Sequence, residues 1–104
     1  MSLQITGQQY IGGARSAAGS TLLYSVNAST GERLPGAFHA ATAGEVDAAA
    51  RAAAAAYPAF RALVPAQRAR FLDAVADGID GLDDAFIALV CDETALPAAR
   101  IAGE

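Results

Sequence analysis

The feature that most constrains the fold of this 104-residue chain is a change in residue type at about residue 42. The residues before it are rich in Gly, Ser, Thr and β-formers, whereas those after it are mostly Ala and other helix formers with regular apolar spacing. At the change, Thr42-Ala43-Gly44-Glu45 has the T-x-x-E form of a capping box, which begins a helix. The chain is therefore predicted to be α+β, with strands and turns over residues 1–41 and helices over residues 42–104.

Three short strands are predicted before this change. Tyr10-Ile11 precedes Gly12-Gly13, which marks a turn, and Leu22–Val26 alternates well enough to form a second strand. Gly19-Ser20 is expected to turn the hairpin between these two strands. Leu34–Ala40 is a third strand, weakened by the Pro and Gly within it.

Prolines and capping residues divide the second part into three to four packed helices. The proline of the first helix should kink it or end it near Tyr57. The second helix should have a proline in its first turn and a glycine cap at its end. An aspartate should begin the third helix. A last proline should start a short fourth helix that includes Ile101. These boundary residues are Thr42, Pro58, Pro65, Gly81, Asp83 or Asp84, and Ala95-Leu96-Pro97.

Three of the predicted helices carry an apolar face at three- and four-residue spacing. The alanines in these faces offer little apolar area, so the core should be thin. If the chain stands alone, these faces should stay exposed and could lead to self-association. The faces comprise Val46, Ala49, Ala50, Ala53, Tyr57 and Phe60, then Leu72, Val75 and Ile79, then Phe86, Ile87, Val90, Cys91 and Thr94.

Charge and cysteine content exclude several classes of protein. A net charge of −4 argues against nucleic acid or an anionic membrane as partner, because both bind clustered positive charge. Residues 1–6 lack the pattern of a secretion signal, and no apolar run is long enough to span a bilayer. The single cysteine cannot form an internal disulfide, which agrees with a reducing compartment. We expect a cytoplasmic protein.

Two residues are candidates for catalysis, and both have a simpler structural interpretation. Cys91 could act as a nucleophile, but its place on the apolar face of a helix favours a buried structural thiol. His39 is the only histidine, and a single imidazole with no companion ligand is a poor metal site. We expect His39 to be solvated or hydrogen-bonded locally.

The remaining polar patterns are also explained more simply by structure. The aspartates could hold a cation and the arginines an anion, but their helical spacing and mixed charge favour an ordinary solvated surface. Gly7–Gly13 resembles a phosphate loop, yet it lacks the lysine that such a loop requires, so Gly12-Gly13 is interpreted as a turn. No catalytic, cofactor-binding or metal-binding residue is predicted. The charged residues concerned are Asp73, Asp77, Asp80, Asp83, Asp84, Arg61, Arg68 and Arg70.

Several motifs, in this order, resemble the start of the aldehyde dehydrogenase superfamily. The last of them resembles the E-T-G-L-P-x-A-R-x-x-G-E stretch of α-ketoglutaric semialdehyde (2,5-dioxovalerate) dehydrogenases and of related NADP-linked fatty aldehyde dehydrogenases. The chain departs from the family pattern at Ala14-Arg15, Ala28, Phe60 and Ala95. The motifs are Tyr10–Gly13, Asn27–Glu32, Ala41–Ala49, Ala55–Arg61, Pro65–Leu72 and Glu93–Glu104.

The resemblance implies that residues 1–104 form the amino-terminal segment of the cofactor-binding domain in the α/β aldehyde dehydrogenase fold. In that family a cysteine thiolate attacks the aldehyde, hydride passes to NAD or NADP, and a glutamate activates the water that hydrolyses the thioester. Those groups come later in the family's sequence, so no catalytic role can be carried onto this chain. It is expected to be inactive alone, to bind no cofactor itself, and to pack against the remainder of the dehydrogenase.

Two alternatives remain open from the sequence. The chain could be a stand-alone, non-catalytic interaction or oligomerisation module derived from the same family. It could also be a small independent enzyme that uses Cys91, which predicts rapid alkylation of that thiol in the native protein.

Overall fold

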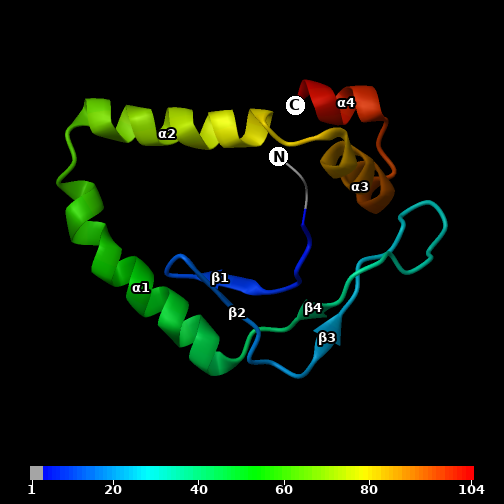
Figure 1. Ribbon diagram of the computed structural model, residues 1–104, viewed down its shortest axis with the longest axis horizontal. Helices are drawn as coiled ribbons and strands as arrows, with labels where there is room; N and C mark the ends of the chain where they lie inside the picture. Colours follow the sequence, from blue (N-terminus) through cyan, green and yellow to red (C-terminus); the bar gives the residue numbers. More distant parts are fainter. Residues whose placement is uncertain (1–3) are drawn as a thin grey trace.

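Four short strands precede four helices over residues 4–104, which the computed structural model describes (Figure 1). The first helix begins at residue 43, so strands and helices separate where the sequence predicts. The prediction about a secretion signal rests partly on residues 1–3, which lie outside the described residues. The elements are β1 (Gln9–Ile11), β2 (Ala14–Ser16), β3 (Leu22–Leu23), β4 (Phe38–His39), α1 (Ala43–Arg61), α2 (Pro65–Asp80), α3 (Asp84–Thr94) and α4 (Ala98–Gly103).

The first hairpin is tighter than predicted. β1 pairs antiparallel with β2, with Gln9 opposite Ser16 and Ile11 opposite Ala14. The turn is Gly12-Gly13, whose φ angles of 59° and 81° are left-handed conformations that glycine adopts without steric cost. The interpretation of Gly12-Gly13 as a turn is confirmed. The prediction that β1 pairs with the strand near residue 22 is wrong, because this turn closes the hairpin at once.

The second pair joins β3 to β4, with Leu22 opposite His39 and Leu23 opposite Phe38. The predicted strands at 22–26 and 34–40 are thus real but shorter, and Val26 adds an isolated bridge to Arg33. Gly19 does not turn a β1–β3 hairpin. Its α-carbon lies against the end of β4, where an added Cβ would come within 2.0 Å of the Ala40 carbonyl oxygen.

The capping box begins α1 as predicted. The Thr42 hydroxyl accepts a hydrogen bond from the Glu45 amide at 3.1 Å, and Glu45 Oε1 accepts one from the Thr42 amide at 3.0 Å. Pro58 lies inside the helix, which continues to Arg61. Of the two expected effects of Pro58, an end of the helix near Tyr57 is wrong, and a kink there stays a prediction.

The later helix boundaries also follow local chemistry. Pro65 is the first residue of α2 and Gly81 its C-cap, while the Asp83 carboxylate accepts a hydrogen bond from the Phe86 amide at 3.2 Å to cap α3. Ala95 ends α3 in a left-handed conformation, with φ of 60°, and α4 follows Pro97. The predicted boundaries at Pro65, Gly81, Asp83 and Pro97 are confirmed.

α1 and α2 meet at an elbow and form two sides of an open frame, with the strands on a third side and α3 and α4 beyond the far end of α2 (Figure 1). The Phe60 and Phe71 rings pack edge to face at the elbow, with centroids 5.5 Å apart. Arg68 Nη1 donates to the Leu63 carbonyl oxygen at 2.9 Å, which satisfies an acceptor beyond the end of α1.

The Ala28 amide donates to the Asp92 carbonyl oxygen at 2.8 Å and so joins the loop after β3 to α3.

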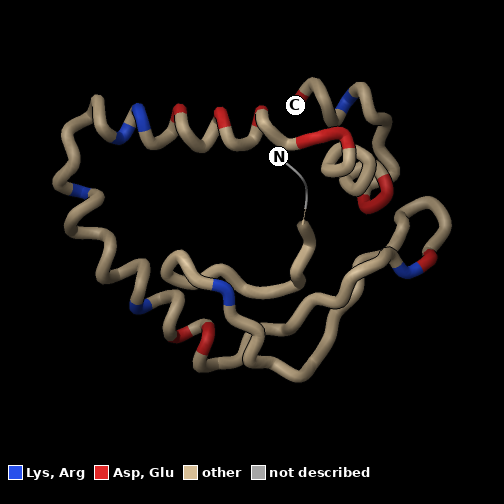
Figure 2. Tube along the Cα trace, in the orientation of Figure 1, with Lys and Arg blue, Asp and Glu red and all other residues tan. Residues whose placement is uncertain are grey.

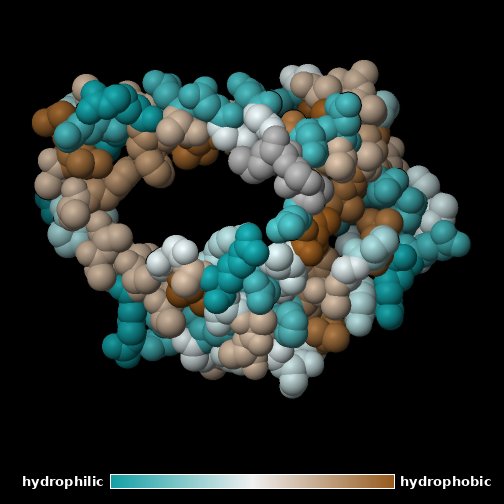
Figure 3. Space-filling view, viewed as in Figure 1, coloured by the Kyte–Doolittle hydropathy of each residue, from teal (hydrophilic) through white to brown (hydrophobic). Residues whose placement is uncertain are grey.

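The frame has no apolar core within residues 4–104, where no hydrophobic side chain is buried. The accessible surface is 7531 Å², whereas a compact monomer of this mass has about 5,400 Å². The radius of gyration is 17.0 Å, whereas about 13 Å is expected for a compact domain of this length. Figure 3 shows an opening bounded by α1 and α2. The predicted thin core is thus an open frame whose helical faces lack cover.

Replacing Ala95 by glycine should stabilise the chain. The left-handed conformation of Ala95 costs an L-residue about 1–2 kcal/mol, and glycine removes this strain. Glycine also makes the unfolded chain more flexible, which costs about 0.4–1 kcal/mol of stability. The net effect of Ala95→Gly should be an increase of about 0.5–1 kcal/mol in the free energy of unfolding. Urea unfolding followed by far-UV circular dichroism measures this difference. Ala88→Gly, in the interior of α3, is the matched control and should lose about 1 kcal/mol. Equal losses in both variants would contradict the strain at Ala95.

Candidate functional site

The most connected polar group in the structure is the carboxylate of Glu45, in the first turn of α1. Its Oε2 accepts a hydrogen bond from the Ser16 hydroxyl at 2.5 Å and one from the Ala18 amide at 3.4 Å. Its Oε1 accepts from the Thr42 amide at 3.0 Å. The residue is only 7% exposed, so β2, the segment after it and the start of α1 all meet at one side chain.

These hydrogen bonds favour the ionised form of Glu45. The Ser16 hydroxyl and then the Thr42 amide lower the pKa of Glu45 below its ordinary value of 4.5, against the opposing effect of burial. The helix N-terminus adds a further favourable field for a negative charge. Glu45 is therefore bound as a carboxylate within the fold, with its oxygens already accepting protein hydrogen bonds rather than free to act as a base.

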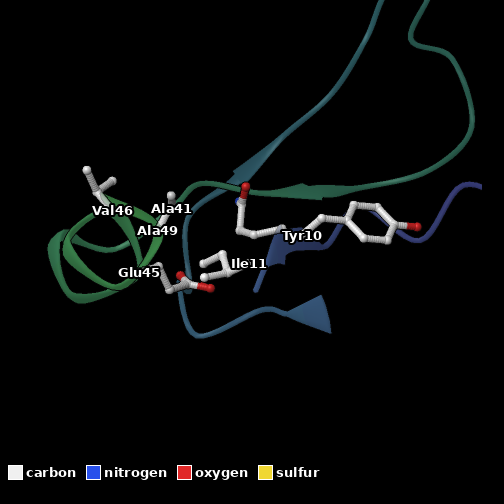
Figure 4. Close-up of a pocket in the computed structure, with 7 residues that line it drawn as sticks. Tyr10, Ile11, Ala41, Glu45, Val46 and Ala49 are labelled. Atoms are coloured by element: carbon white, nitrogen blue, oxygen red, sulfur yellow. The ribbon is translucent and has the colours of Figure 1, made fainter. Parts of the chain in front are cut away.

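A pocket of about 220 Å³ lies beside Glu45, between β1 and the first turns of α1. In Figure 4 the Ile11 side chain lies next to the Glu45 carboxylate, while the Tyr10 ring points away from α1. Most of its wall is apolar, so it suits a hydrophobic side chain better than a polar substrate. The lining residues are Gln9, Tyr10, Ile11, Ala41, Glu45, Val46 and Ala49.

The two catalytic candidates from the sequence lie apart from this pocket. Cys91 is on α3 beside the half-buried Val90, and it is itself half-buried rather than fully buried as expected. His39 lies in β4, where Nδ1 is 2.8 Å from the Gly19 carbonyl oxygen, so Nδ1 carries the proton and donates. This hydrogen bond confirms the local structural interpretation of His39. Neither residue lines the pocket beside Glu45.

The acidic residues of α2 form a solvated surface, as predicted, whereas Arg68 does not. Asp73, Asp77 and Asp80 are exposed on α2, and in Figure 2 the acidic residues of this helix lie on the side away from the frame's opening. Across residues 4–104, no group of three His, Cys, Asp or Glu side chains converges on a possible metal position. Arg68 is half-buried because its guanidinium donates to backbone carbonyls at the elbow. The apolar face predicted for α3 is half-buried, except Thr94, which is exposed.

The N-termini of the three longer helices do not fit the phosphates of a dinucleotide. Phosphates bind at helix N-termini that offer free amides and no competing negative charge. Here Glu45 occupies the start of α1 and the Asp83 carboxylate caps α3, while α2 starts with a proline that has no N–H. The start of α4 has no such group, but this helix is only six residues long. The prediction that this chain holds no cofactor, metal or catalytic residue stays a prediction.

Sequence reasoning missed the long-range role of Glu45. The capping box located the residue, but its second oxygen reaches Ser16 and Ala18, more than twenty-five positions earlier. A serine at the end of a short strand gives no local sign of its partner. The only usable signal was that the glutamate of a capping box has two carboxylate oxygens. The capping box engages one of them, which leaves the other free to accept a further hydrogen bond.

Large apolar side chains are exposed along α1 and α2, and Figure 3 shows hydrophobic residues at the edge of the opening. Soluble monomers rarely expose large contiguous apolar patches. The exposed apolar residues of this region are Val46, Tyr57, Phe60, Val64, Phe71, Leu72, Val75 and Ile79.

Comparison with known proteins identifies the family of this chain. The model of the aldehyde dehydrogenase family matches residues 15–104. The chain belongs to the aldehyde dehydrogenase family. The predicted fold class, short hairpins followed by four helices within this family, is thus confirmed.

Relatives in the aldehyde dehydrogenase family also support the narrower resemblance. Alpha-ketoglutaric semialdehyde dehydrogenase 2 of Azospirillum brasilense is 39% identical over 103 residues, which are 98% of this chain and 20% of the relative. Alpha-ketoglutaric semialdehyde dehydrogenase of Acinetobacter baylyi is 38% identical over 98 residues, which are 94% of this chain and 19% of the relative. The chain thus spans about a fifth of the length of these relatives.

No solved structure matches the chain. Within residues 4–104, no helix of this aldehyde dehydrogenase segment combines the length and hydropathy needed to cross a membrane.

Acidification should loosen the contact between β2 and α1. Because the folded pKa of Glu45 lies below its ordinary value, its stabilising contribution is present above about pH 4.5 and is lost as the pH falls through the folded pKa. Urea unfolding at pH 7 and again below pH 4 should show a drop in stability that Glu45→Gln largely removes. Glu93→Gln, at an exposed position on α3, is the control and should keep the drop. An equal drop in Glu45→Gln and in the unmodified chain would contradict this role.

Proposed function

We propose that this chain is the amino-terminal portion of an NAD(P)-dependent aldehyde dehydrogenase that oxidises a semialdehyde, α-ketoglutaric semialdehyde, to the carboxylate. The observation that carries the proposal is the family match over residues 15–104, together with relatives named for that substrate along nearly the whole chain. In this proposal the 104 residues alone are inactive. Their role is to support a catalytic centre formed by the remainder of the protein.

The proposed role is structural support within the cofactor-binding domain. The apolar sides of α1 and α2 are exposed, and the pocket beside Glu45 is shaped for a hydrophobic side chain. We infer that the remainder of the dehydrogenase covers these surfaces. In this proposal no step of the reaction is assigned to the described residues. The free thiol of Cys91 and the lack of an internal disulfide support a cytoplasmic location.

The exposed apolar surface also favours a second candidate function. A stand-alone, non-catalytic interaction or oligomerisation module of the same family would present such a surface to its partner. The two candidates differ in one respect, which is whether the chain contributes to an active dehydrogenase when joined to a catalytic remainder.

A chimera tests this difference. The aligned amino-terminal fifth of the Azospirillum brasilense relative is replaced by these 104 residues, and NAD(P)H formation from α-ketoglutaric semialdehyde is followed by absorbance. We expect kcat/KM within about tenfold of the relative, equivalent to about 1.4 kcal/mol, because the segment supports the site without touching the substrate. The 104-residue chain alone should form no NAD(P)H.

Paired variants make the chimera test more specific. Val75→Asp and Ile79→Asp together place charge on the apolar side of α2, which the remainder should cover, and they should abolish activity or soluble expression. Asp73→Asn and Asp77→Asn together, on the solvated side of the same helix, are the matched control and should leave activity unchanged. A soluble, folded chimera that forms no NAD(P)H would contradict the proposed function.

A further inference from the structure

We draw no further inference here: the strongest candidate, the edge of β3 that faces away from β4 and carries the exposed side chains of Leu22, Leu23 and Tyr24, supports no proposal because nothing in the structure shows what covers it.

Discussion

The arrangement of the first half of the molecule depends on one buried carboxylate. Glu45 caps the helix to which it belongs and at the same time binds the hydroxyl and amide of a segment that precedes it by more than twenty-five residues. Without this side chain, the β1–β2 hairpin would be connected to α1 mainly by apolar contacts at the exposed pocket wall. A single hydrogen-bonded carboxylate thus connects the hairpin to the helix, a connection that buried hydrophobic side chains make in most domains.

Elsewhere the frame is held at its corners by a few individual interactions. The Phe60–Phe71 contact and Arg68 fix the elbow, Asp83 caps α3, and one backbone hydrogen bond joins Ala28 to α3. Such contacts set angles between neighbouring elements, but they bury little apolar area. Backbone ordering costs about 1–2 kcal/mol per residue, and apolar burial is the main term that offsets it. With no buried hydrophobic side chain, the described residues lack most of this offsetting term.

Features fixed by neighbouring residues could be predicted from the sequence, and features fixed across the chain could not. The starts of all four helices follow from Thr42, Pro65, Asp83 and Pro97, because a cap or a proline acts within one turn. Strand pairing was predicted wrongly, because the tight Gly12-Gly13 turn pairs β1 with β2, while β3 pairs with the distant β4. The second interaction of Glu45 and the open shape of the frame depend on contacts between distant segments, on which local patterns give no information.

The two candidate functions make different demands on the apolar side of α2. In the proposed dehydrogenase, a remainder joined to the same chain would act at an effective concentration in the millimolar range, which a separate partner rarely reaches. Cover of Phe71, Val75 and Ile79 from within the same polypeptide would then prevail over an outside partner. The alternative module would instead leave this row exposed for its partner, as it is in the 104-residue chain.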